Sequence, residues 1–193
     1  MLSCQAQPGP PSVATALPTI DEKESKQQIR ASLAQDRTKE AITQADKVLA
    51  VQPDDAEALM LRGAAYAQQG LAAIACTDLN RAVELRPNDV ETRVVRARTR
   101  LFQKDARGAL TDMNHACAQP GLTSLTLCNR AEVLMQMQAP KKALADLNAA
   151  IKLDPKAPLA YALRAQTHKQ LGHKAEAEAD ARRAQALAQT TPR

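Results

Sequence analysis

Small and apolar residues recur along this chain of 193 residues at intervals of 34 positions. Within one interval they are spaced four and then three residues apart, which places them on one face of an α-helix. Three positions behave in this way through five intervals: Ala41, Ala75, Ala109, Ala143 and Ala177; Ala45, Leu79, Met113, Leu147 and Ala181; and Val48, Ala82, Ala116, Ala150 and Ala184. The pattern predicts a repeated helix whose small-residue face packs closely against a neighbour.

Each interval is long enough for two helices, and the second interval indicates where they begin and end. Asp54 and Glu57 have the spacing of a capping box, so a first helix is predicted over residues 56–69. Gly70 suits the left-handed turn that ends such a helix. A second helix is predicted over residues 71–85, and the later intervals repeat the same plan.

Proline marks the end of most intervals, at Pro53, Pro87 and Pro155, with Pro120 close to the remaining position. Counting from these prolines gives five predicted units: 22–55, 56–89, 90–123, 124–157 and 158–191. A fixed period of this size is typical of a stacked array, in which no unit buries its apolar face alone. Residues 1–21 hold four prolines and lack the helical period, so they are predicted to form a disordered N-terminal tail.

Composition narrows the fold class further. Hydrophobic residues make up 45% of the chain but aromatic residues only 2%, so Ala, Leu, Val, Ile and Met must supply the core. Six glycines leave little room for hairpin turns, which argues against an all-β fold. No apolar run reaches the roughly 18 residues that a membrane-spanning helix needs.

The units resemble the tetratricopeptide repeat family, and the second unit carries the resemblance on Gly63, Tyr66, Ala75, Ala82 and Pro87. The resemblance covers about residues 22–191 and implies an all-α fold, a right-handed superhelical solenoid of five helix–turn–helix repeats. It also implies a non-catalytic scaffold whose first helices line a concave groove for a partner peptide or domain.

By the same resemblance, the groove would present one set of side chains along its length: Lys26, Arg30, Met60, Ala64, Val94, Arg98, Phe102, Cys128, Glu132, Met135 and Gln166. The middle of this set is apolar and its N-terminal end is basic. We therefore expect a partner with an acidic or amphipathic segment.

Arginine and aspartate also recur with the period. Arg62, Arg96, Arg130 and Arg164 occupy one position of units two to five, and Asp78, Asp112, Asp146 and Asp180 follow them by 16 residues. Unit one has Gln28 and Gln44 there, so the two charges are present or absent together. This predicts that each guanidinium grips the carboxylate of its own hairpin with two hydrogen bonds. Pairing of each Asp with the Arg of the next unit, or two solvated charges, are the alternatives.

Cysteine allows two further hypotheses. Cys117 and Cys128 flank the irregular junction at Pro120, where they could form a disulfide in an oxidising compartment or remain buried thiols. Cys4 follows a small residue and precedes a polar stretch, like the start of a mature bacterial lipoprotein. Lipidation there would anchor the chain to a membrane, in the cell envelope or periplasm; otherwise a cytoplasmic location is expected.

Candidate chemistry is sparse. His115 has no cluster of metal-type ligands near it, and the chain holds no phosphate-binding loop or nucleophile motif. We expect no enzyme activity, cofactor, metal or small-molecule substrate. The net charge of +5 comes with almost no aromatic residues, which disfavours nucleic-acid binding. The remaining alternative of that class is RNA binding through four clustered arginines: Arg93, Arg96, Arg98 and Arg100.

Overall fold

The computed structural model describes residues 22–190, which form ten α-helices and no strand. The bounds are α1 (Glu22–Ala34), α2 (Thr38–Val51), α3 (Ala56–Gln68), α4 (Ala72–Leu85), α5 (Val90–Phe102), α6 (Ala106–Cys117), α7 (Ser124–Gln136), α8 (Pro140–Leu153), α9 (Pro158–Leu171) and α10 (Lys174–Thr190). The predicted tail at residues 1–21, with Cys4, lies outside the described residues.

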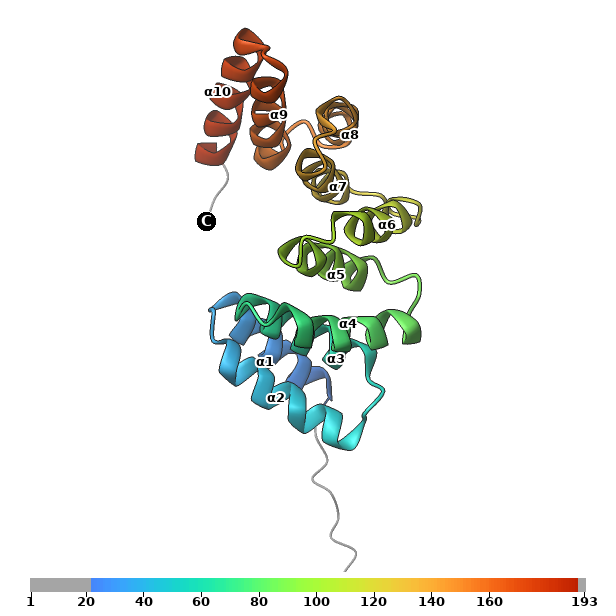
Figure 1. The fold of residues 1–193 in the computed structure, drawn as a ribbon. Coiled ribbons are helices and arrows are strands. Elements are labelled where there is room, and N and C mark those ends of the chain that lie inside the picture. The colour runs from blue at the N-terminus through green and yellow to red at the C-terminus, as the bar shows by residue number, and fades with distance from the viewer. Residues whose placement is uncertain (1–21, 191–193) are drawn as a thin grey trace, which may run out of the picture.

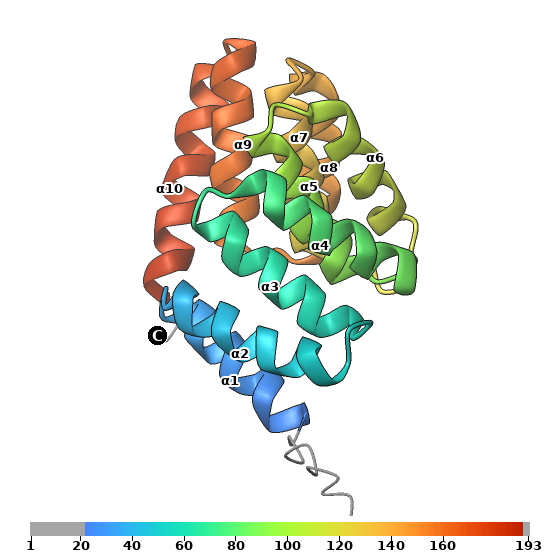
Figure 2. The same cartoon turned by 60° about the horizontal axis from the view of Figure 1, so that its bottom comes forward.

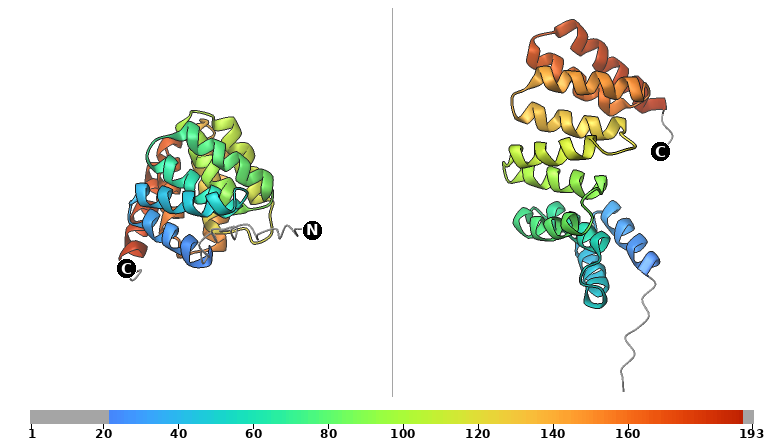
Figure 3. Two further views of the ribbon diagram at one scale, coloured as in Figure 1. Left: turned by 90° about the horizontal axis from the view of Figure 1, so that it is seen from below. Right: turned by 90° about the vertical axis from the view of Figure 1, so that its right-hand side faces the viewer.

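The helices form antiparallel pairs that follow one another from α1 and α2 to α9 and α10 (Figure 1, Figure 2). Figure 3 shows the pairs as successive layers of one stack. Odd-numbered helices of successive units contact each other, whereas even-numbered helices make no such contact over residues 22–190. The odd-numbered helices therefore line the inner, concave side. The predicted all-α, right-handed superhelical solenoid is confirmed.

The periodic small residues form the core of the stack. Ala41, Ala75, Ala109 and Ala143 are fully buried, and so are Leu79, Met113 and Leu147 one turn later. The equivalent residue of α10, Ala181, is exposed, and Ala184 is half-buried. The described chain has no helix after α10 that could cover this face, and the polar residues of α10 solvate it.

A left-handed residue ends the first helix of every unit, at the same point of the repeat: Asp36, Gly70, Lys104, Gln138 and Gly172, with φ between 56° and 80°. The residue after it donates its backbone N–H to the carbonyl five residues earlier, as Leu71 does to Tyr66 at 2.9 Å. This is the Schellman arrangement, which satisfies carbonyls that the helix end would otherwise leave unpaired.

The N-terminal cap of α3 lies one residue later than the sequence predicted. Asp55 caps the helix, and its Oδ1 accepts the N–H of Ala58 at 2.7 Å. Asp54 instead accepts hydrogen bonds from the exposed guanidinium of Arg81. The reason is that a turn after Pro53 closes with the N–H of Asp55 on the carbonyl of Gln52, which leaves Asp55 as the last extended residue.

The disulfide hypothesis is corrected by the structure, because Cys117 and Cys128 are both free thiols. The Cys117 Sγ lies 4.0 Å from the backbone carbonyl oxygen of Thr126. Cys128 lies on α7, two residues after Thr126. It is 1% exposed, and burial raises the pKa of its thiol to about 11. Cys128 belongs to the core cluster of units four and five and Cys117 packs against the edge of that cluster, but the two sulfur atoms are not bonded.

Candidate partner-binding groove

All four predicted Arg–Asp pairs are in contact within their own hairpins. In each pair the guanidinium Nε and Nη2 donate to the two carboxylate oxygens of the Asp. The distances are 2.7 and 2.8 Å for Arg62–Asp78, 2.9 and 2.5 Å for Arg96–Asp112, 2.8 and 2.7 Å for Arg130–Asp146, and 2.7 and 2.7 Å for Arg164–Asp180. The carboxylates are buried, so each pair joins the two helices of its unit across a poorly solvated contact.

The third guanidinium nitrogen of each Arg makes a further contact, which was not predicted from the sequence. Nη1 of each Arg reaches back to a side-chain oxygen of the preceding unit: Asp46 at 2.7 Å, Asn80 at 3.0 Å, Asn114 at 3.4 Å and Asn148 at 2.8 Å. These acceptors also recur every 34 residues, each 16 positions before its Arg. This period in the sequence could therefore have predicted the contact between units. Each Arg links its own hairpin to the one before it.

Asp112 binds more arginine side chains than the other three aspartates do. Its oxygens accept from Arg93 at 3.3 Å and from Arg100 at 2.7 Å, in addition to Arg96. The Asp112 side chain is 1% exposed. Three of the four arginines of the RNA hypothesis are thus turned toward one buried carboxylate, and only Arg98 of the four projects into the groove.

The N-terminal half of the concave side is an internally paired ionic surface. Lys26 Nζ lies 2.5 Å from Asp55 Oδ2, and both side chains are largely buried. Arg30 on α1 binds Glu57 on α3 at 3.1 Å and Glu91 on α5 at 2.6 Å. The hydrogen bond to Glu91 is the largest cause of a raised pKa of the Arg30 guanidinium. The basic end that the sequence predicted is therefore neutralised by acidic side chains of the same chain.

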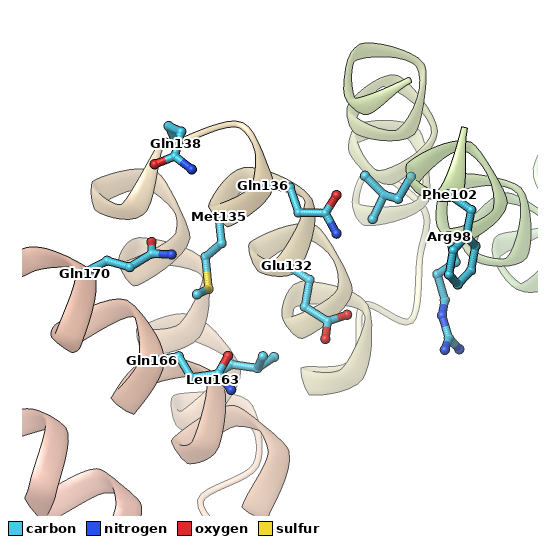
Figure 4. Close-up of a pocket in the computed structure, with 10 residues that line it drawn as sticks. Arg98, Phe102, Glu132, Met135, Gln136, Gln138, Leu163, Gln166 and Gln170 are labelled. Atoms are coloured by element: carbon cyan, nitrogen blue, oxygen red, sulfur yellow. The ribbon is translucent and has the colours of Figure 1, made fainter. Parts of the chain in front are cut away.

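The C-terminal half of the concave side contains an open pocket of about 520 Å³ between α5, α7 and α9. Figure 4 shows its side chains converging from these three helices. The lining residues are Arg98, Leu101, Phe102, Glu132, Met135, Gln136, Gln138, Leu163, Gln166 and Gln170. Phe102 is 73% exposed and is the single Phe of the chain. The pocket therefore combines apolar side chains with amide groups and one charge of each sign.

Comparison with known proteins agrees with this architecture. The family model described as tetratricopeptide repeat matches residues 27–90 and 128–192, which is more than half of the chain. The chain belongs to the tetratricopeptide repeat family. Comparison with curated protein sequences found no match.

Solved structures show the same tetratricopeptide fold at low sequence identity. PilF of Pseudomonas aeruginosa is 17% identical with a TM-score of 0.76, over 89% of this chain and 77% of PilF. MamA of Desulfovibrio magneticus is 17% identical with a TM-score of 0.73, over 89% and 97%. A tetratricopeptide repeat protein of Parabacteroides merdae is 19% identical with a TM-score of 0.70, over 84% and 64%. At these identities the likeness concerns the fold alone.

The pocket of this tetratricopeptide chain contains only part of the predicted groove set. Arg98, Phe102, Glu132, Met135 and Gln166 line it. Cys128 is buried, and so is Met60, at 3% exposure; both serve the core instead. Ala64 and Val94 are half-buried and lie outside the pocket lining. Lys26 and Arg30 belong to the ionic half described above.

Five lining residues were not predicted from the sequence: Leu101, Gln136, Gln138, Leu163 and Gln170. Four of them lie in the last turns of α5, α7 and α9 or just beyond, where the regular repeat register gives way to the turn. Glutamine occurs in the corresponding turns of all five units, so composition gave no signal that those of units four and five line a pocket.

One position of the repeat is acidic in the ionic half of the concave side and apolar in the other half. Glu57 and Glu91 occupy it in units two and three, where both bind Arg30. Leu125 and Leu159 occupy it in units four and five, with 57% and 42% of their surface exposed. Leu125 and Leu159 can form no ion pair at this position of their tetratricopeptide units and remain exposed to solvent.

Over residues 22–190, no group of three His, Cys, Asp or Glu side chains is arranged to hold a metal ion. Within the same residues, none of the helices combines the length and apolar character needed to cross a membrane.

Proposed function

We propose that this chain is a protein-interaction scaffold that binds an amphipathic segment of a partner in the C-terminal half of its concave side. Tetratricopeptide proteins are generally scaffolds of this kind and are typically non-catalytic. The observation that supports the location is Phe102, which stands 73% exposed beside a pocket formed with Leu101, Met135 and Leu163. A large exposed aromatic side chain next to a hollow is typical of an interaction anchor.

The polar side chains of the pocket favour a partner that presents backbone or amide groups. Four glutamine side chains, Gln136, Gln138, Gln166 and Gln170, can each donate and accept hydrogen bonds. Arg98 and Glu132 contribute opposite charges, so they would orient a partner without selecting its net charge. The acidic partner expected from Lys26 and Arg30 is less favoured than an amphipathic one, because both cations already bind carboxylates.

Selection of binders from a random peptide library tests this proposal and leaves the sequence of the partner open. We expect selected peptides to carry an apolar face and to lose at least about tenfold in affinity for a Phe102→Asp variant, since a charge would be desolvated at the anchor. Ile74→Asp is the matched control, because Ile74 is also apolar and 49% exposed but lies on α4, outside the pocket.

Peptides that bind wild-type, Phe102→Asp and Ile74→Asp proteins equally would contradict the proposed location. A library that yields no binder would contradict the scaffold function for isolated segments. Circular dichroism of both variants shows whether the helices are intact, since substitution of exposed residues should leave helicity unchanged.

A further inference from the structure

The Schellman turns bring two residues of each unit together: the residue four positions before the left-handed residue and the residue directly after it. The five pairs are Ser32 and Arg37, Tyr66 and Leu71, Arg100 and Asp105, Leu134 and Ala139, and His168 and His173. In every pair the backbone N–H of the second residue donates to the carbonyl of the first, at 2.8 to 2.9 Å. An apolar contact commonly fills this place. Unit five places two imidazoles there instead.

The two imidazoles face each other through the same ring nitrogen. The Nδ1 atoms of His168 and His173 are 3.1 Å apart, and the ring centroids are 5.4 Å apart at an angle of 45°. Two nitrogens at this separation share one proton, because one must donate and the other must accept. A lone pair on each Nδ1 would become available if a cation took the place of that proton.

We propose that His168 and His173 form a two-histidine site for a divalent transition-metal ion, of the class of Zn²⁺, Ni²⁺ and Cu²⁺. Metal–imidazole bonds of about 2.0–2.1 Å place two nitrogens about 3.3 Å apart at a tetrahedral angle and about 2.9 Å apart at a right angle. The Nδ1 separation of 3.1 Å lies between these values. The nitrogens are therefore already spaced for one ion. The rings now face each other end-on, with centroids 5.4 Å apart, so they would turn by roughly 40° in total at each nitrogen to aim both lone pairs at that ion. Imidazole is a preferred ligand for these metals.

The surroundings of the pair favour a preorganised and accessible site. Gly172, with φ 80°, and the hydrogen bond from His173 N to His168 O fix the backbone on both sides. The His168 side chain is 13% exposed, and its other nitrogen, Nε2, lies 3.9 Å from Asp180 Oδ2. At this distance the Asp180 carboxylate, which also binds Arg164, makes no hydrogen bond to the ring but adds a negative charge that favours a bound cation. His173 is exposed, so water or a ligand from a partner can complete the coordination.

Calorimetric titration of the full chain, without a histidine tag, with the chlorides of Cu²⁺, Ni²⁺ and Zn²⁺ tests the proposal. We expect one equivalent of metal to bind, with Cu²⁺ tighter than Ni²⁺ or Zn²⁺. His168→Gln and His173→Gln should each weaken binding at least about tenfold, because each removes one of two ligands. His115→Gln is the matched control, since His115 lies on α6 and contacts Asn88, and its affinity should equal that of wild type.

The double variant His168→Gln, His173→Gln separates this site from any other in the chain, including the cysteines. Undiminished binding in the double variant would overturn the proposal, and so would the absence of binding of all three ions to the wild type. A second readout is thermal unfolding. Metal should raise the midpoint of wild type and of His115→Gln but not of the double variant, because only a ligand that binds the folded state stabilises it.

Discussion

At the scale of single residues, the four Arg–Asp pairs look equivalent in the sequence but not in their surroundings. Asp146 receives hydrogen bonds from Arg130, whereas Asp112 receives them from Arg93, Arg96 and Arg100. Desolvation and the neighbouring arginines lower the pKa of Arg93, although Asp112 opposes this shift. One buried carboxylate thus offsets the mutual repulsion of three partly buried cations.

Replacing that carboxylate should therefore be unusually costly. We expect Asp112→Asn to lower the free energy of unfolding by about 3–5 kcal/mol, because it leaves buried cations without their counterion. Asp146→Asn is the matched comparison and should cost about 1–3 kcal/mol, the range for one lost partner of a buried hydrogen-bonding group. Urea denaturation of both variants measures the difference. Equal losses would show that the two additional arginines of the Asp112 cluster contribute nothing.

At the scale of the helix, the same left-handed turn is built from different residues in different units. Gly70 and Gly172 adopt it without a steric cost, whereas Asp36, Lys104 and Gln138 place a Cβ in the left-handed region. The fold nevertheless uses the turn in all five units, because the two helices of a hairpin must reverse direction within a few residues. The reversal within each hairpin therefore imposes a backbone conformation that three local sequences do not favour.

Exchanging the residue types at these turns should change stability in opposite directions. We expect Gly70→Ala to lower the free energy of unfolding by about 1–2 kcal/mol, the cost of a left-handed non-glycine residue. A Cβ at Gly70 would meet no atom within 4 Å, so no steric overlap adds to this value. Lys104→Gly should raise the free energy of unfolding by up to about 1 kcal/mol, because relief of strain exceeds the added freedom of the unfolded chain.

Chemical denaturation of the two variants under one condition shows whether the free energy of unfolding falls for Gly70→Ala and rises for Lys104→Gly. A loss of stability for Lys104→Gly would mean that the side chain of Lys104 contributes more than its strained backbone costs.

Features that recur at equivalent positions of the units were predicted from the sequence. Contacts that depend on how far a side chain extends were not. The period alone predicted the helices, the small-residue core and the pairing of Arg62 with Asp78 in its own hairpin. It did not predict that Nη1 of Arg62 also binds Asp46, since a period shows which positions correspond and not which atoms meet. The same limit applies to Arg30, whose partner Glu91 is 61 residues away.

The groove prediction failed for the same physical reason. A side chain at the expected repeat position is exposed only if no neighbour covers it, and Met60 is covered by the core of units one and two. The cap of α3 shifted by one residue because Asp54 and Asp55 have equal propensity, and the turn after Pro53 decided between them.

At the scale of the whole molecule, the concave side of the solenoid is ionic in its N-terminal half and more apolar in its C-terminal half. Unit one lacks the Arg–Asp pair and has a long hydrogen bond of 3.4 Å between Ser32 and Gln44 instead. Its helix α1 is held by buried Ile29 and by the ion pairs of Lys26 and Arg30 with α3 and α5. Because Arg30 is 42% exposed, salt can screen part of this attachment.

The two ends should consequently respond differently to salt. Between low salt and about 1 M salt the Debye length falls to about 3 Å, and exposed pairs worth up to about 1 kcal/mol lose their attraction. We expect hydrogen exchange of the α1 amides to accelerate about two- to fivefold, while amides of α7 and α8 stay unchanged, since apolar residues dominate the core between them.

An Arg30→Gln variant provides the control for this last prediction, because at low salt it should reproduce the exchange rates that wild-type α1 shows at high salt, and added salt should change them little. Equal acceleration in α1 and in α7 would indicate a general effect of salt on the stack. Unchanged exchange of α1 in both the variant and high salt would indicate that Ile29 and the small-residue face hold unit one without help from the ionic surface. Either result would show that the charges of the concave side are not what holds α1 against α3 and α5.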